Sequence, residues 1–364
     1  MSALEKLRIY LVPGLVLQSV VIGGGYATGR ELIEFFLDDG PLGGVLGIAV
    51  AGLVYAAAAA IAFELARVTR SYDYRRFCKQ LLGRGWLLFE IAYLTLLLLI
   101  LSVVGSAAGE MASTIFGIPS VLGSSVFVVL IGVLTFFGSD AIAKVLASWS
   151  AVLYVTYFLL IAAAFVFLGD DIVASFQRSE LGSNWWQSGI TYAGYNLAIL
   201  PAVLFSASRL SNRKETLTSG FIAGALVVMP AILFYVALMG LYPAIGDAAV
   251  PAASLMSALQ LGWLSIIFYV VIYGTLVETG AGLLHAVNER ISSSYAERNK
   301  ALPRYARPLI ALSILAVSLY GASSIGIVDL IANGYSALTK VFLVIFVLPL
   351  FTIGVWKICV AKGS

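Results

Sequence analysis

The segment that decides the fold lies in the middle of the first apolar stretch and reads Gly23-Gly24-Gly25-Tyr26-Ala27-Thr28-Gly29. A charged half-helix follows it directly, Arg30-Glu31-Leu32-Ile33-Glu34-Phe35-Phe36. Each glycine costs about 1 kcal/mol relative to alanine inside a helix, so three in a row favour an unwound backbone. In a membrane, the freed N–H and C=O groups are tolerated only where they line a polar cavity. Small residues also form helix-packing faces, but these are spaced four apart rather than contiguous. The segment therefore predicts a broken membrane-spanning helix.

The composition places the chain in a lipid bilayer. Of its 364 residues, 61% are hydrophobic and only 11% are charged, whereas soluble domains carry about 45–50% apolar and about 25% charged residues. This scarcity of charge excludes a soluble globule, a disordered chain and a nucleic-acid-binding protein. The two cysteines, Cys78 and Cys359, are too few for a disulfide framework and are expected to be inert thiols on the cytoplasmic side.

Ten apolar runs are candidates for membrane spans, which predicts an all-α polytopic membrane protein. They lie near residues 9–37, 41–66, 86–112, 122–138, 145–168, 187–207, 217–242, 261–285, 308–322 and 327–357. Nearly all of the 22 Lys and Arg residues fall in alternate loops, on the side that also holds both termini. The positive-inside rule therefore places both termini in the cytoplasm. We expect one transmembrane domain over residues 1–364.

The sixth run is expected to break as well. In this run Tyr192-Ala193-Gly194-Tyr195-Asn196 precedes Pro201, which removes a backbone hydrogen bond and kinks a helix. Runs one and six each open a block of five spans, and because five is odd the two blocks have opposite orientations. Paired interruptions in two inverted halves point to the binding site of a transporter. The pattern thus predicts a five-plus-five inverted repeat over approximately residues 8–168 and 187–357.

The first-span motif resembles that of a known family. Gly23 to Leu32, followed by Phe35-Phe36, is similar to the first-helix signature of YkvI-type bacterial membrane proteins, and Tyr192 to Asn196 resembles their sixth helix. That family is placed near the amino acid–polyamine–organocation (APC) superfamily, which has the LeuT-type five-plus-five fold. The resemblance implies a multi-pass secondary transporter, a symporter of the bacterial inner membrane, and does not supply its substrate.

The two breaks together define the expected substrate site. The N–H groups at the start of the outer half-helix, at its positive dipole end, would hold a carboxylate or another electronegative group. The expected substrate-binding residues are Gly23, Gly24, Gly25, Tyr26, Ala27, Thr28, Tyr192, Gly194, Tyr195 and Asn196.

A second expected site lies in the eighth span, within Gly274-Thr275-Leu276-Val277-Glu278-Thr279-Gly280. Thr275, Glu278 and Thr279 share one helix face because residues three and four apart are neighbours. The resemblance implies a sodium site here, with the Thr275 carbonyl, the Glu278 and Thr279 side chains and carbonyls of the broken first span as ligands. A buried carboxylate could carry a proton instead. The alternative without a coupling role is that the Glu278 charge faces a water-filled cytoplasmic vestibule.

Three charged residues follow the first break. Arg30 and Glu34 are four apart and can pair across one helical turn, either as a gate of the outer vestibule or as a structural pair. Glu31 points about 100° away from Arg30. It is grouped with this pair, although it can also face the substrate or another helix.

These patterns favour an ion-coupled secondary transporter of a small polar metabolite that works by alternating access. An amino acid or a related zwitterion or amine is the expected substrate, and a nucleobase or an organic cation is the alternative. An enzyme is not expected, because one histidine cannot form a two-histidine metal site and no phosphate-binding loop is present. A channel stays open as the rival class. Apart from a bound sodium ion or a transported proton, no cofactor is expected. The expected partners are the small-molecule substrate and the lipid bilayer, without nucleic acid, and the oligomeric state is left open.

Overall fold

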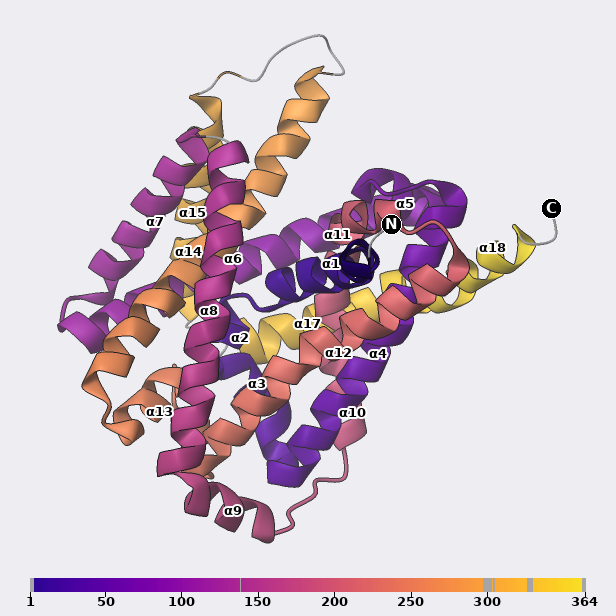
Figure 1. Cartoon of the computed structure of the whole chain (residues 1–364). Coiled ribbons are helices and arrows are strands. Elements are labelled where there is room, and N and C mark those ends of the chain that lie inside the picture. The colour runs from indigo at the N-terminus through magenta and orange to yellow at the C-terminus, as the bar shows by residue number, and fades with distance from the viewer. Residues whose placement is uncertain (1–2, 138, 297–302, 304, 326–329, 362–364) are drawn as a thin grey trace.

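The computed structural model describes the chain apart from residues 1–2, 138, 297–302, 304, 326–329 and 362–364, and every regular element of the described part is helical (Figure 1). The prediction of an all-α protein is therefore confirmed. The principal helices are α1 (Ala3–Val21), α4 (Gly40–Thr69), α6 (Trp86–Phe116), α7 (Ser120–Phe137), α8 (Ser139–Phe167), α10 (Trp185–Asn196), α12 (Arg213–Leu238), α14 (Gly262–Ala296) and α15 (Ala306–Ile325).

Several of these helices can cross a membrane. Within the described part of the chain, six helical segments are long and apolar enough to do so. The count is seven if Val152–Phe167 and α9 (Gly169–Gln177), which meet at an angle of 76°, are taken together as one bent span. Three shorter apolar helices, Ile9–Gln18, Ser120–Thr135 and Ala306–Gly321, lie in the first, fourth and ninth expected runs. The count of ten spans, the inverted repeat and the orientation of the termini stay predictions.

Glycines bring α4 and α12 into close contact. A Cβ atom on Gly220 of α12 would lie 2.4 Å from the Ala60 backbone, and one on Gly224 would lie 2.6 Å from the Gly52 carbonyl oxygen. Lipid is as apolar as a leucine side chain, so helices in a membrane associate through tight packing of small residues. The contact between α4 and α12 therefore forms a rigid wall beside the broken helices.

Three short helices lie outside the expected runs: α5 (Tyr74–Leu82), α9 and α13 (Pro251–Leu259). In α5, the Asp73 side chain accepts a hydrogen bond of 2.9 Å from the backbone N–H of Arg76 and thereby caps the helix. The helix buries Phe77, Cys78 and Leu81 and exposes its basic side chains. It is amphipathic and covers one end of the bundle.

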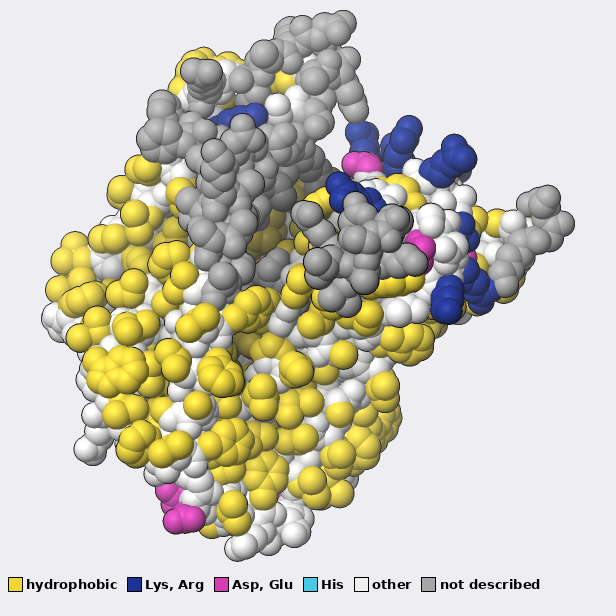
Figure 2. Space-filling view, viewed as in Figure 1, with side chains coloured by type: hydrophobic (Ala, Val, Ile, Leu, Met, Phe, Trp, Pro, Cys, Tyr) yellow, Lys and Arg dark blue, Asp and Glu magenta, His cyan; other side chains and the backbone are white. Residues whose placement is uncertain are grey.

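The charges separate to two ends of the molecule. Figure 2 shows Lys and Arg gathered around α5, with a few Asp and Glu among them, a second group of Asp and Glu near α9, and apolar side chains between the two ends. We call the first the basic end, with exposed Arg70, Arg75, Arg76, Lys79 and Arg84. The second is the acidic end, with exposed Asp38, Asp170, Asp171 and Glu180. This separation matches the loop charges, which place the basic end in the cytoplasm by prediction.

The first span is broken twice. Helix α1 ends at Val21, α2 (Gly24–Ala27) has only four residues, and α3 (Arg30–Phe36) follows. Gly29 between α2 and α3 has φ 80°, a left-handed conformation that glycine adopts without a steric penalty. The glycine-rich segment thus interrupts the helix, and the four-residue α2 lies between the two breaks.

The sixth span loses its regular α-helical winding around Pro201. Tyr192 to Asn196 belong to the regular helix α10, and the irregular stretch comes after them as η3 (Leu197–Ile199), α11 (Leu200–Val203) and η4 (Leu204–Arg209). The physical reason is Pro201, which has no N–H to bond the Leu197 carbonyl. The Leu200 N–H bonds that carbonyl instead and tightens the turn. The irregular stretch thus lies around Pro201, the residue expected to kink this run, directly after the Tyr192–Asn196 motif, and the chain tightens there rather than unwinds.

The last span alternates between α-helical and wider turns. It runs through η7 (Leu330–Tyr335), α17 (Ser336–Phe342), η8 (Leu343–Val347), η9 (Leu350–Gly354) and α18 (Val355–Val360), of which η7, η8 and η9 are π-helical. Single π-turns inside helices occur frequently at functional sites. The first of them carries Tyr335, which faces α10.

Candidate functional site

The first break lies directly against α14. At the end of α1 the N–H of Gly23 bonds the Val21 carbonyl at 2.7 Å, and the chain then turns into α2. A Cβ atom on Gly23 would lie 3.4 Å from Cγ2 and 3.6 Å from Oγ1 of Thr279. The structure thus brings together two residues that the sequence assigned to different expected sites.

The other predicted coupling residues lie on the same helix as Thr279. The Thr275 hydroxyl is buried and donates to the Val271 carbonyl of its own helix at 2.9 Å. Glu278 is half-buried and interacts electrostatically with Tyr154 of α8. The Thr279 hydroxyl therefore lies beside the unwound backbone, and the Glu278 carboxylate belongs to the preceding residue of the same helix; all of these are hard oxygen groups.

The second break has its carbonyl groups satisfied by protein. The Ala27 carbonyl accepts a hydrogen bond of 2.8 Å from the Tyr157 hydroxyl of α8. The Thr28 carbonyl accepts one of 2.9 Å from the Ala252 N–H of α13. Each partner comes from a different element, so the α2–α3 junction is held in place on two sides.

A cluster of tyrosines surrounds the carboxylate of Glu31. Glu31 is 5% exposed and accepts a hydrogen bond from the Tyr195 hydroxyl. Four further hydroxyls interact electrostatically with the same carboxylate. We call Glu31 and these tyrosines the Glu31 cage: Tyr26 of α2, Tyr55 of α4, Tyr192 and Tyr195 of α10, and Tyr335 of η7.

The rings of the cage pack against one another. The Tyr195 and Tyr335 rings stack with their centroids 4.7 Å apart, and Tyr192 stands edge-on to Tyr195 at 5.9 Å. All five tyrosines are at most 2% exposed. Four helical segments from both halves of the chain therefore converge on one buried carboxylate.

Several polar groups of the cage lack a hydrogen-bond partner among the described residues. These are the hydroxyls of Tyr26, Tyr55 and Tyr192; the Thr339 hydroxyl of α17, which is not part of the cage, also lacks one. The Tyr55 hydroxyl faces the Asn196 amide, but the two groups do not reach hydrogen-bonding geometry. A buried polar group without a partner costs about 1–3 kcal/mol. Such groups mark a place where a polar guest can bind.

Arg30 points away from the cage and fastens the acidic end. Its Nη2 atom lies 2.5 Å from Glu34 Oε2, and its Nη1 atom donates to the Gly246 and Ala248 carbonyls at 2.8 and 3.1 Å. Through these carbonyls Arg30 ties α3 to η6 (Ala244–Asp247). The geometry is that of a buried structural clamp, and Glu31 does not share it.

A polar cavity of about 520 Å³ opens at the acidic end. Its lining combines the end of α3, the start of α10 and the last span: Glu34, Phe35, Asp38, Asp39, Gly182, Ser183, Asn184, Gln187, Ser188, Thr191, Ile331, Ala332 and Ser336. Phe35 stacks on Tyr195 with centroids 5.7 Å apart and meets Tyr192 edge-on at 5.4 Å. The Phe35 side chain therefore separates this acidic vestibule from the Glu31 cage.

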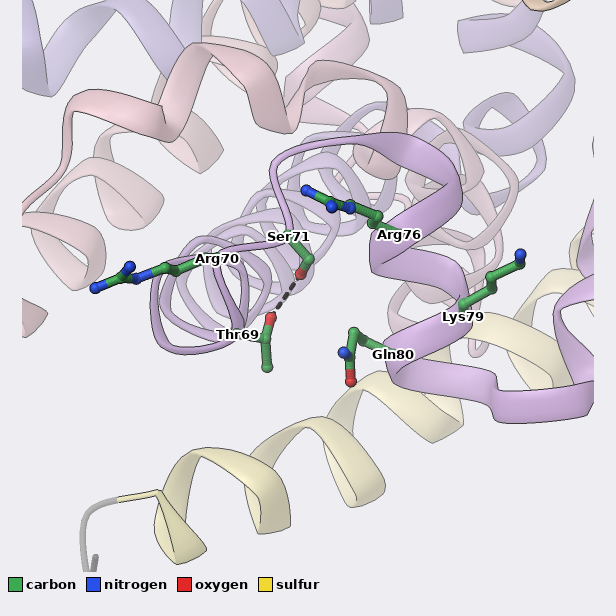
Figure 3. A pocket seen from close by; sticks show the side chains of 6 residues that line it. All are labelled: Thr69, Arg70, Ser71, Arg76, Lys79 and Gln80. Carbon is green, nitrogen blue, oxygen red and sulfur yellow. Dashed lines mark hydrogen bonds between the residues drawn. The ribbon is translucent and has the colours of Figure 1, made fainter. Parts of the chain in front are cut away.

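A second cavity of about 520 Å³ lies at the basic end, far from the cage. Its lining residues come from the end of α4 and from α5, and the Thr69 and Ser71 hydroxyls bond each other at 2.5 Å (Figure 3). The charged side chains of Arg70 and Lys79 point in opposite directions (Figure 3). Fourteen helical residues separate Tyr55 from Thr69, which corresponds to about 21 Å. This cavity is not part of the substrate site.

The remaining predicted substrate residues lie in different surroundings. Gly24 and Gly25 form the start of α2. Gly194 packs against α17, because a Cβ atom there would lie 2.9 Å from both Thr339 and Leu343. Asn196 donates to the Tyr192 carbonyl of its own helix at 3.2 Å. Sequence reasoning missed Tyr55 and Tyr335 of the cage, and also Tyr157. They lie in apolar runs where no local signal separates an inward-facing tyrosine from a core residue.

Comparison with known proteins identifies the fold. No known family model matches the chain. YkvI of Bacillus subtilis strain 168, an uncharacterised membrane protein, is 24% identical over 323 residues, which cover 86% of this chain and 88% of YkvI. Three solved structures are similar. A manganese transporter of Eremococcus coleocola has a TM-score of 0.60 and 15% identity, over 96% of this chain and 79% of that one. A Na⁺-coupled sialic acid symporter has a TM-score of 0.63 and 15% identity, over 94% of this chain and 78% of that one. MhsT in complex with L-phenylalanine has a TM-score of 0.57 and 14% identity, over 96% of this chain and 97% of that one. The chain is thus a membrane protein with the LeuT-type fold.

Proposed function

We propose that this protein is an ion-coupled secondary transporter that carries a small polar metabolite across the bacterial cytoplasmic membrane by alternating access. The proteins that share its fold support this proposal, since by their names they transport manganese, sialic acid with Na⁺, or bind L-phenylalanine. Their fold accommodates very different substrates, so the substrate class has to come from the site of this chain.

The observation that carries the proposal is the double break of the first span. It places Gly23 against Thr279 on one side and Tyr26 in the Glu31 cage on the other. Broken helices with buried polar groups near the middle of a bundle are the arrangement in which transporters bind substrate and coupling ion. The substrate site in this proposal comprises the Gly23–Thr28 segment, Tyr192, Tyr195 and Asn196, with Gly194 as a packing position.

The proposed coupling site consists of Thr275, Glu278 and Thr279 next to Gly23. If it binds sodium, substrate affinity rises with sodium concentration, and Glu278→Gln weakens that dependence because one anionic ligand is lost. If Glu278 carries a proton, a pH gradient drives uptake without sodium, and Glu278→Gln leaves only uncoupled exchange. Thr279→Ala harms the sodium mechanism more, because only sodium needs the hydroxyl as a ligand.

A channel is the alternative of a different class. It would dissipate a gradient without saturation, whereas a transporter saturates and accumulates substrate against a gradient. The stacking of Phe35 on Tyr195 favours the transporter, because it separates the cage from the vestibule in a way that alternating access requires.

The decisive experiment is uptake into proteoliposomes with sodium and proton gradients imposed separately. Substrates for it come from a thermal-shift screen of the purified protein against amino acids, amines and nucleobases, with and without sodium, because a bound ligand raises apparent stability. Accumulation driven by either gradient supports the proposal. Linear, gradient-independent flux would establish a channel instead. Equal uptake by native protein and Glu278→Gln under both gradients would move the coupling site elsewhere.

A further inference from the structure

We propose that the Glu31 cage binds a protonated amine, with the ammonium group of the substrate paired to the Glu31 carboxylate. This inference rests on the proposed function and names the substrate class of its site. Its first observation concerns the pairing of the Glu31 carboxylate. Among the described residues, the ion pairs are Arg30–Glu34 and Arg67–Glu64, so Glu31 has no cationic partner there. A buried charge requires pairing and hydrogen bonding, and Tyr195 supplies only one hydrogen bond.

The walls of the cage suit a cation. Five tyrosines interact with the carboxylate, Tyr195 through a hydrogen bond and the others electrostatically, and the negative faces of aromatic rings attract an ammonium group within about 6 Å. The Tyr26 and Tyr192 hydroxyls, which lack partners among the described residues, provide oxygen atoms that accept N–H hydrogen bonds. A primary ammonium has three N–H donors and no acceptor, so one guest can satisfy the carboxylate and two hydroxyls.

An anionic guest does not fit the same surroundings. A carboxylate would meet Glu31 as a like charge in a site from which water is excluded. Arg30, the cation next to Glu31 in sequence, is already paired with Glu34, and its other terminal nitrogen donates to the carbonyls of Gly246 and Ala248, so that only its buried Nε lacks a partner among the described residues. The cage therefore offers no described cation to hold the carboxylate of an amino acid, and a net-positive amine is favoured over a zwitterion.

The acidic vestibule that leads to the cage also favours a cation. Asp38 and Asp39 line the acidic vestibule together with Glu34, which is paired with Arg30, and the lining itself contains no Lys or Arg. A cleft lined by one sign of charge concentrates ligands of the opposite sign. Phe35 is then the side chain that has to move for an amine to pass from the vestibule to Tyr195 and Glu31.

The test measures binding of charge-matched probes to the purified full-length protein by thermal shift and calorimetry. One series is phenethylamine, phenylalanine and 3-phenylpropionate, and the other is butylamine, 4-aminobutyrate and butyrate. At least one of the two amines is expected to bind at least tenfold more tightly than the zwitterion and the acid of the same series. Protection by acids or zwitterions that equals or exceeds protection by amines, or no protection by either amine, would overturn the proposal.

Variants locate the binding group. Glu31→Gln, which keeps the shape and removes the charge, is expected to weaken amine binding at least tenfold. Asp171→Asn removes one exposed negative charge at the acidic end and is expected to change it less than twofold. Tyr192→Phe keeps the ring and is expected to cost less than Tyr192→Leu, which removes it. Native amine affinity in Glu31→Gln would show that the ammonium binds elsewhere.

The probe series is measured on the native protein. The proposal can therefore be tested even if a variant does not fold. The binding assay also separates this inference from the proposed function. Amine binding without gradient-driven uptake would refute transport and leave the cage intact. Gradient-driven uptake of an acid without amine binding would refute the cage and leave transport intact.

Discussion

Replacement of Gly23 by valine is expected to separate the first helix break from α14, whereas replacement by alanine is expected to be tolerated. A Cβ atom at this position would lie 3.4 Å from Thr279 Cγ2, which is an ordinary van der Waals contact. Valine adds two methyl groups about 1.5 Å beyond Cβ. Thr279 lies on one side of the Cβ position and the Val20 carbonyl lies 3.7 Å away, so staggered methyls have little room.

The magnitude follows from the cost of overpacking. Extra methyl groups in a well-packed interior typically cost about 1–3 kcal/mol. Each 1.4 kcal/mol is a factor of ten in an equilibrium constant. If the strain acts on the conformation in which Gly23 and Thr279 are in contact, the affinity for the coupling ion falls roughly fivefold to a hundredfold in Gly23→Val. In Gly23→Ala it changes less than about threefold, because a contact of 3.4 Å needs no displacement.

The assay is the half-saturating concentration of the driving ion in proteoliposome uptake. Gly282→Val is the matched control, because it lies on α14 and a Cβ atom there meets nothing within 4 Å. Melting curves of all three variants report whether they fold. A folded Gly23→Val protein with the half-saturating ion concentration of the native protein would refute the assignment of the coupling site to the Gly23–Thr279 contact.

Three further predictions concern stability. Arg30→Gln is expected to lower the free energy of unfolding by about 3 kcal/mol, because it breaks a largely buried ion pair and two hydrogen bonds, and an unchanged melting temperature would contradict the clamp. Gly220→Ala is expected to cost at least about 1–3 kcal/mol, since its Cβ would overlap backbone atoms, while Gly169→Ala, which meets nothing within 4 Å, stays near native in thermal melts. The hydrogen bond to Glu180, and then partial burial, raises the pKa of Tyr242 above its usual value near 10. A group with a raised pKa stabilises the fold below its unfolded pKa and loses this effect as pH rises, so the melting temperature of native protein should exceed that of Tyr242→Phe at pH 8 and approach it above pH 10.

The sequence predicts the first break well because its cause is local. Three contiguous glycines and a left-handed Gly29 act on the backbone wherever the rest of the chain lies. The pairing of Thr279 with Gly23 was within reach as well, through the resemblance to the LeuT-type fold. In the sixth span the cause is also local, but its effect appears four residues before Pro201, at the Leu197 carbonyl that loses its donor. Tyr192–Asn196 therefore stays regular helix and lies directly before the altered winding.

The cage could not be predicted in full because its cause is not local. Tyr55 lies in a long apolar helix and Tyr335 in a π-helical turn, and neither stretch differs from an ordinary span. Only the convergence of four segments shows that both face Glu31. Helix α5 is different, since its cap at Asp73 and the alternation of buried Phe77 and Leu81 with basic residues are readable as an amphipathic surface helix.

Within the proposed function, the short helix α2 links ion and substrate physically. It has four residues, about 6 Å of helix, with Gly23 and the coupling site at one end and Tyr26 in the cage near the other. Breaks on both sides separate α2 from the winding of α1 and α3, and the hydrogen bonds from Tyr157 and Ala252 hold its α3 end in the position seen here. An ion and an amine that both favour this position of α2 must each raise the affinity of the other by the same factor. Gly23 opens the proposed substrate segment, but a side chain there would meet Thr279 and the Val20 carbonyl rather than a residue of the cage, so Gly23→Val is expected to disturb the ion end. It is therefore expected to reduce the factor by which the ion raises amine affinity, while amine affinity without the ion stays near native. Equal loss of amine affinity with and without the ion would mean that valine distorts the cage itself and that α2 does not couple the two sites.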